Sequence, residues 1–95
     1  MRDNLFEWDD RKADSNLKRH KVSFDQARAA FDDPDAIERD DPDPDEVRVK
    51  LIGRAGRQLL VIVYTEREGR DGILRNRIIS AREATHHEEA LYKAG

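Results

Sequence analysis

The first part of the chain follows the period of a helix in its apolar and polar positions. A short apolar stretch, Leu5–Trp8, predicts an edge strand, and Asp9 follows it as a helix N-cap. The positions i, i+3, i+4 and i+7 of this helix share one face, occupied by Ala13, Asn16, Leu17 and His20. Lys21 and Val22 interrupt the pattern, so we expect the first helix to end there.

The next segment carries a stronger helix signal. Ser23 and Gln26 have the spacing of a capping box, which marks a helix start. The expected buried stripe consists of Phe24, Ala27, Ala30 and Phe31. Asp33-Pro34 ends the helix, because the residue before a proline is driven out of the helical conformation.

After Pro34 the pattern changes to the alternation of β-strands. Val47–Ile52 alternates apolar and basic residues, whereas Leu59–Thr65 is apolar on both faces, as in a central strand covered on both sides. The predicted strands are, in order, Ala36–Arg39, Val47–Ile52, Leu59–Thr65 and Arg75–Ala81. Glycines place the hairpin turns at Gly53–Arg57 and Glu66–Leu74.

The last segment, Glu83–Lys93, predicts a terminal helix. Its expected inner face consists of Ala84, His87, Leu91 and Ala94. The elements together predict an α+β fold: two N-terminal helices packed on an antiparallel β-sheet of about four strands, then a C-terminal helix, with the helices in one layer. The length fits a single domain over residues 1–95.

Composition narrows the possible chemistry. The chain is 41% charged and has no cysteine, which excludes a disulfide framework, a Cys-ligated metal and a thiol nucleophile. The N-terminus lacks an apolar signal segment, and the longest apolar run, Leu59–Tyr64, is too short to cross a membrane. We therefore expect no membrane association.

The net charge of −3 conceals a strong asymmetry along the chain. Residues 32–46 contain nine acids and one base, whereas residues 48–82 contain nine bases and three acids. Eight of those nine bases are Arg, whose planar guanidinium matches phosphate oxygens bidentately. This half of the chain indicates an anionic partner such as RNA, DNA or an acidic peptide. The alternative is a solvated basic face paired with the protein's own acidic loop.

Arginines on neighbouring strands could form a phosphate clamp. If the last strand is regular through Arg82, then Arg77 and Arg82 point to opposite faces of the sheet; Arg82 could instead belong to the turn before the helix. The alternative is again that these arginines are tied to nearby carboxylates.

The histidines offer acid–base chemistry but no metal site. His can act as general acid or base near neutral pH, which makes His20 a candidate, although a packed core role is the alternative. His86 and His87 are adjacent, so on a helix they point about 100° apart and do not chelate together.

Several fragments, in this order and spacing, resemble the BrnT toxin family. The N-terminal fragments are Phe6–Asp9, Lys12-Ala13, Asn16, His20, Val22–Phe24, Ala27, Phe31 and Asp33-Pro34. The C-terminal fragments are Arg48, Ile52-Gly53, Leu59–Arg67, Arg77–Arg82, Glu89 and Tyr92. Each fragment alone is weak, but together they cover about residues 5–92.

The resemblance implies a type II toxin–antitoxin system. The expected toxin has a RelE-like fold, acts as a metal-independent endoribonuclease in the cytoplasm without a cofactor, and inhibits translation. Its expected partners are an RNA substrate, a BrnA-type antitoxin with a ribbon–helix–helix pattern, and operator DNA only through the antitoxin complex.

The resemblance also implies site residues. The catalytic candidates are His20, Lys12, Arg48, Arg67 and Arg77, and the candidates for substrate binding are Asn16, Arg82 and Tyr92. Two positions depart from the family pattern. Lys21 replaces the usual Gly, so the first helix should end differently, and Val47 replaces a frequent acid, so Arg48 needs another partner such as Glu46.

The expected mechanism is attack of the RNA 2′-hydroxyl on the adjacent phosphate, which Arg48, Arg67 and Arg77 would hold. His20 or Lys12 would assist proton transfer, and Arg82 or Tyr92 would position the substrate. The alternative is a non-catalytic binding module whose Arg-rich face receives an antitoxin or nucleic acid.

Overall fold

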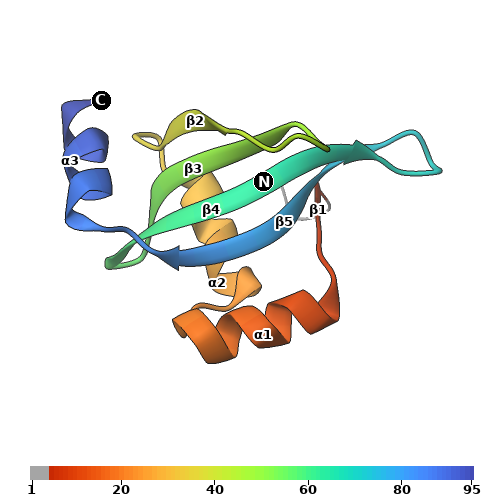
Figure 1. Cartoon of the computed structure of the whole chain (residues 1–95), viewed down its shortest axis with the longest axis horizontal. Coiled ribbons are helices and arrows are strands. Elements are labelled where there is room, and N and C mark those ends of the chain that lie inside the picture. The colour runs from red at the N-terminus through yellow and green to blue at the C-terminus, as the bar shows by residue number, and fades with distance from the viewer. Residues whose placement is uncertain (1–4) are drawn as a thin grey trace.

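A computed structural model describes residues 5–95 and shows one five-stranded sheet in the order β1-β5-β4-β3-β2 (Figure 1). The helical elements are α1 (Asp10–His20), α2 (Phe24–Arg28), the 3₁₀ turn η2 (Ala29–Asp32) and α3 (His86–Ala94). The strands are β1 (Phe6–Glu7), β2 (Ile37–Asp41), β3 (Arg48–Ala55), β4 (Gln58–Glu68) and β5 (Leu74–Glu83). The pairs β2–β3, β3–β4 and β4–β5 are antiparallel, and the two-residue β1 adds a parallel edge to β5. The α+β class is confirmed.

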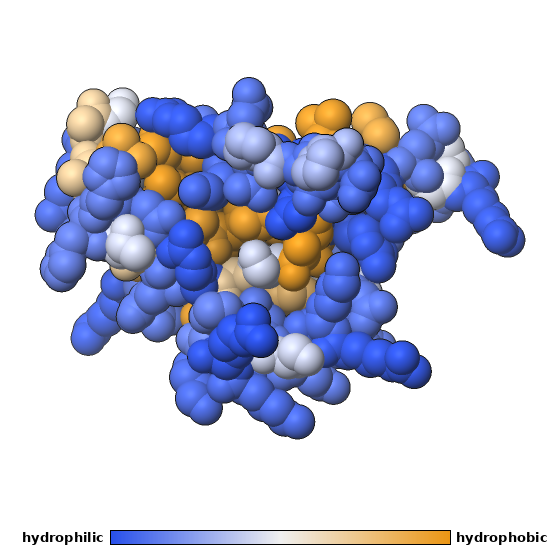
Figure 2. Space-filling view, in the orientation of Figure 1, coloured by the Kyte–Doolittle hydropathy of each residue, from blue (hydrophilic) through white to orange (hydrophobic). Residues whose placement is uncertain are grey.

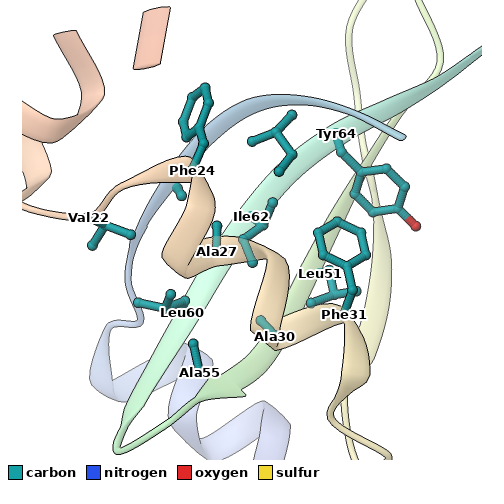
Figure 3. Packing of buried hydrophobic residues seen from close by; sticks show 12 residues of the cluster. Val22, Phe24, Ala27, Ala30, Phe31, Leu51, Ala55, Leu60, Ile62 and Tyr64 are labelled. Carbon is teal, nitrogen blue, oxygen red and sulfur yellow. The ribbon is translucent and has the colours of Figure 1, made fainter. Parts of the chain in front are cut away.

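The main core lies between α2 with η2 and one face of the sheet (Figure 3). The predicted stripe of Phe24, Ala27, Ala30 and Phe31 is buried. Phe31 packs edge-on against Tyr64, with ring centroids 5.0 Å apart. Ser23 accepts a hydrogen bond from the Gln26 N–H at 2.9 Å, which confirms the predicted start of the second helix.

The third helix covers the opposite face of the sheet, so the expected single layer of helices is wrong. Tyr92 packs on Ile52 and Val61, which alternate with the residues of the main core. Glu88 and Tyr92 are its buried side chains, whereas His87 and Ala94 of the expected inner face are exposed. The Glu88 carboxylate can be buried on this helix face because the Arg82 guanidinium on β5 forms an ion pair with it.

A β-bulge in β5 changes which face its side chains occupy. Ser80 pairs with Val63 and Ile78 with Tyr64, so Ile79 is an extra residue between consecutive pairs. Arg77 pairs with Thr65 and Arg82 with Val61, positions of the same parity in β4. Arg77 and Arg82 therefore lie on the same face of the sheet. The prediction of opposite faces assumed a regular strand, and the bulge makes β5 irregular.

The first hairpin turn is tighter than expected. Only Gly56 and Arg57 form the turn, and Gly53 lies inside β3. A Cβ at Gly53 would approach the Ala30 carbonyl oxygen to 2.7 Å. The glycine thus marks a close approach of η2 to the sheet, not a turn.

The first helix ends as a glycine would end it, contrary to the expectation from Lys21. Lys21 has φ 60° and ψ 26°, a left-handed conformation, and its N–H bonds to the Leu17 carbonyl at 2.9 Å. This is the usual C-terminal motif of a helix, but a Cβ makes the conformation unfavourable.

Replacement of Lys21 by Gly should therefore stabilise the protein by about 1 kcal/mol, since the left-handed conformation no longer carries a steric penalty. Urea denaturation measures this change. The matched control is Lys18→Gly inside α1, which should destabilise by about 1 kcal/mol. A loss of stability in Lys21→Gly would contradict the assigned strain.

The salt bridge of Glu88 should make stability depend on pH. The Arg82 guanidinium lowers the pKa of Glu88 from 4.5 to about 2. Its contribution is complete above pH 4.5 and is lost as the pH falls toward 2. At neutral pH we expect Glu88→Gln to be less stable than the natural chain by about 3 kcal/mol.

This difference should narrow between pH 5.5 and 3, as followed by urea denaturation across that range. Glu89→Gln serves as control, because the Glu89 side chain is partly exposed and its ion pair with Lys93, at 3.7 Å, lies at the surface. A difference between Glu88→Gln and the natural chain that stays constant with pH would refute the stabilising ion pair.

Candidate active site

A hollow of about 300 Å³ runs between α1 and β5. The sequence-predicted residues Lys12, Asn16 and His20 all line it, together with Ile79 and Ser80 of the bulged strand. The three residues share one face of α1, as the helical period predicts. The structure thus brings together the N-terminal part of the predicted site.

A second hollow, of about 370 Å³, joins α1 to the strands. Lys12, Arg67 and Arg77 line it, and so do the carboxylates of Glu46 and Glu66. Its other lining residues are Val47, Thr65 and Ile79. Lys12 and Ile79 line both hollows, so the two are adjacent; we refer to them together as the α1–β5 groove.

The bulge at Ile79 shapes this groove. The extra residue interrupts the alternation of β5, and its side chain forms part of the wall of both hollows. Bulges near functional sites commonly redirect a side chain in this way. Figure 2 shows apolar surface over the middle of β4 and β5, above α1, framed by hydrophilic side chains.

Arg77 is held in place by Glu7. The Arg77 guanidinium donates to the Glu7 carboxylate at 2.7 Å, and both side chains are partly exposed. The short β1 places Glu7 directly beside Arg77 on β5. One carboxylate occupies only part of a guanidinium with five N–H donors, so Arg77 retains donors for a second anion.

Lys12 and Arg67 carry the unpaired positive charge of the second hollow. Within residues 5–95, neither side chain makes an ion pair or side-chain hydrogen bond. The interpretation that the arginines are tied to internal carboxylates therefore applies to Arg48, Arg75, Arg77 and Arg82 but not to Arg67.

Asn16 is committed to the backbone. Its amide nitrogen donates to the carbonyls of Val22 at 2.9 Å and Ala81 at 2.7 Å, and its oxygen accepts from the Ala81 N–H at 3.1 Å. The side chain, only 6% exposed, replaces a strand partner on the free edge of β5. It thereby fixes α1 against the sheet.

Arg48 is the first residue of β3 and faces the acidic turn, residues 40–46, outside the residues that line the groove. Its guanidinium donates to Asp43 at 2.6 Å and faces Asp41 at 3.4 Å, whereas Glu46 is 4.0 Å away. Glu46 is therefore a partner of Arg48 as expected, but it is the most distant of three, and Asp43 is the principal one. The neighbouring Val47 is 84% exposed.

Arg82 and Tyr92 also engage other parts of the protein. Arg82 donates two hydrogen bonds of 2.7 Å to Glu88, which Lys50 also approaches at 3.9 Å. These ion pairs hold α3 against the face of the sheet that is opposite to α2.

Tyr92 holds the other end of α3. Its hydroxyl donates to Asp33 at 2.7 Å. Burial alone would raise the pKa of Asp33, but hydrogen bonds from the N–H groups of Arg54 and Asp35 and from Tyr92 outweigh it, and the pKa is lowered. The same bond to Asp33 raises the pKa of Tyr92. The pair therefore persists as hydroxyl and carboxylate at neutral pH.

Sequence reasoning missed several residues of the site. Glu7 could have been found from the sequence, because it lies within the N-terminal motif fragment. Arg11 and Arg19 could have been found because they lie next to Lys12 and close to Asn16 and His20 on the same helix. Ile79 lies within the motif fragment Arg77–Arg82, but no signal in the sequence placed a bulge there. Across residues 5–95, no three His, Cys, Asp or Glu side chains are grouped so that they could hold a metal ion.

The model of a known protein family matches residues 8–88, most of the chain, and its description is the ribonuclease toxin BrnT of type II toxin–antitoxin systems. The chain belongs to the BrnT family. The earlier resemblance is thereby confirmed, and the BrnT match includes every candidate site residue except Tyr92. No curated protein matches the chain. No helix within the described residues is long and apolar enough to span a membrane.

Substitution of Asn16 by Ala should destabilise this BrnT protein by about 2 kcal/mol, because a buried N–H and two carbonyls lose their partner. Thermal or urea denaturation measures the loss. Ser15→Ala, a neighbouring exposed position on α1, is the control and should leave stability within about 0.5 kcal/mol. Unchanged stability in Asn16→Ala would exclude the anchoring role.

Proposed function

We propose that this chain is an endoribonuclease toxin that cleaves RNA without a metal, using the α1–β5 groove. The observation that carries the proposal is the convergence of Lys12, Arg67 and Arg77 on one hollow from three different elements. Three cations around a space of this size suit a phosphodiester whose negative charge increases in the transition state.

The proposed reaction is an intramolecular transfer. The 2′-oxygen forms a bond to phosphorus and gives up its proton to a base, while the bond from phosphorus to the 5′-oxygen breaks. A proton from an acid neutralises that leaving oxygen. The products are a 2′,3′-cyclic phosphate and a 5′-hydroxyl, and the groove cations supply the positive charge that the reaction needs.

Lys12 and His20 are the two candidates for proton transfer. Lys12 lies where the two hollows meet, beside Arg67 and Arg77. His20 is eight residues further along α1, about 12 Å by the helix rise. The geometry therefore supports Lys12 as the group nearer the reacting phosphate and His20 as a group at the far end of the groove.

Other predicted site residues have roles that do not require contact with RNA. We assign Asn16 to holding α1 in position, and Arg82 and Tyr92 to holding α3 through Glu88 and Asp33. Arg48 organises the acidic turn next to Val47, which lines the second hollow. In this scheme Arg67 and Arg77 contact the phosphate.

The proposed biological setting follows from the family. We infer that residues 1–95 form one toxin domain that acts in the cytoplasm and inhibits translation by cleaving RNA. A BrnA-type antitoxin with a ribbon–helix–helix pattern would neutralise it, and the complex would bind operator DNA through the antitoxin. Family membership supports an antitoxin partner and an RNA target.

Arg77→Ala should reduce kcat/KM for RNA cleavage roughly 100-fold, because a positioned donor to the reacting phosphate is lost. The assay follows a fluorescent RNA in EDTA, so that metal-dependent contaminants are inactive. Arg75→Ala is the matched control: Arg75 lies on the same strand but is paired with Asp71 and lines neither hollow.

Cleavage by Arg77→Ala at the natural rate would remove Arg77 from the mechanism. RNA binding without any cleavage by the natural chain would instead favour the non-catalytic binding module. Cleavage that requires an added divalent cation would refute the metal-independent mechanism.

A further inference from the structure

The α1–β5 groove extends beyond the three cations that surround the proposed reaction site. Arg11 and Arg19 line the first hollow, one toward each end of α1. Both are exposed, and within residues 5–95 neither makes an ion pair or side-chain hydrogen bond. Neither is among the fragments by which the sequence resembles the BrnT family.

The acidic residues of α1 do not neutralise this side of the helix. At 100° per residue, Asp10 and Asp14 lie about 160° away from Lys12 around the helix axis, on the opposite side. Asp9 precedes the helix, and its carboxylate accepts hydrogen bonds from the N–H groups of Arg11 and Lys12. Lys12 and Arg19 thus lie on the side of α1 away from both carboxylates. Arg11 is about 60° from Asp14 around the axis, but within residues 5–95 the two form no ion pair.

We propose that the first hollow is a binding subsite for single-stranded RNA next to the cleaved bond, with Arg11 and Arg19 on its flanking phosphates and bases. The proposal rests on the proposed function, because it takes the phosphate at Lys12, Arg67 and Arg77 as its starting point. Arg11 and Arg19 are about 12 Å apart along the helix, so they contact different nucleotides.

The chemistry of the hollow favours RNA over an acidic peptide. It is continuous with the second hollow through Lys12 and Ile79, so a chain bound at one extends into the other. Guanidinium planes stack on unpaired bases as well as binding phosphates, and Ile79 supplies an apolar wall for a base. An acidic peptide would interact with the positive charge of Arg11 and Arg19 but not with their stacking planes or the apolar wall.

The test measures binding separately from cleavage. A fluorescein-labelled 12-nucleotide RNA with 2′-O-methyl groups cannot be cleaved, and its anisotropy gives Kd at several salt concentrations. The double variant Arg11→Ala/Arg19→Ala is compared with Arg57→Ala/Arg70→Ala, which removes the same charge from two exposed arginines that do not line the groove.

The groove variant should bind at least tenfold more weakly than the control variant, and its slope of log K against log salt should be less steep by about 1.4. For a cleavable 12-mer, KM should rise while kcat is unchanged. Cleavage of a dinucleotide, which has a single phosphate, should be unaffected, because that phosphate occupies the second hollow.

Three outcomes would overturn the subsite. Equal weakening in both double variants would show general charge attraction. An equal loss of binding to poly-L-glutamate would assign the hollow to acidic peptides, and a loss of dinucleotide cleavage would place these arginines at the reacting phosphate. If the natural chain cleaves nothing but only the groove variant loses RNA binding, the subsite stands and the proposed function fails.

Discussion

The hydrogen bonds between Asn16 and Ala81 hold the functional half of this protein together. A single amide side chain pairs with both backbone groups of Ala81 and also binds the Val22 carbonyl. The contact closes the free edge of β5 and seats α1 beside it. Together with the packing of Ala13 on the main core, it sets the position of the α1 cations relative to those of the sheet, and the groove lies where the two elements meet.

The protein separates its charges into paired and available groups. The acidic turn neutralises Arg48, and Glu88 neutralises Arg82 while approaching Lys50. These pairs stabilise the β2–β3 connection and the seat of α3. By contrast, four cations that line the groove make no ion pair within residues 5–95: Arg11, Lys12, Arg19 and Arg67. Arg57 and Arg70 are also exposed, but they lie outside the groove. A chain with a net charge of −3 thereby presents a locally cationic surface.

Strain and irregularity occur next to the groove. Lys21 holds a left-handed conformation immediately after His20, and the Ile79 bulge lies between the two hollows. Both features fix where α1 and β5 present their side chains. A regular strand would have turned Arg77 and Arg82 to opposite faces, whereas the bulge leaves both on the face that α2 does not cover.

The sequence by itself determined the local structure and the family. The caps at Asp9 and Ser23, the buried stripe from Phe24 to Phe31 and the apolar central strand follow from short-range rules, which depend on neighbours in the chain. The motif fragments then indicated the BrnT family. They also placed Lys12, Asn16, His20, Arg67 and Arg77 among the candidate site residues.

Only the tertiary structure decided which of those residues share a site. The motif fragments include Arg48, Arg82 and Tyr92 just as they include Arg77. These three side chains, however, bind Asp43, Glu88 and Asp33, which lie outside the groove. The face of α3, the bulge at Ile79 and the commitment of Asn16 were equally hidden. Each depends on contacts between distant segments, and no periodicity within one segment records which carboxylate or backbone group will lie opposite a side chain.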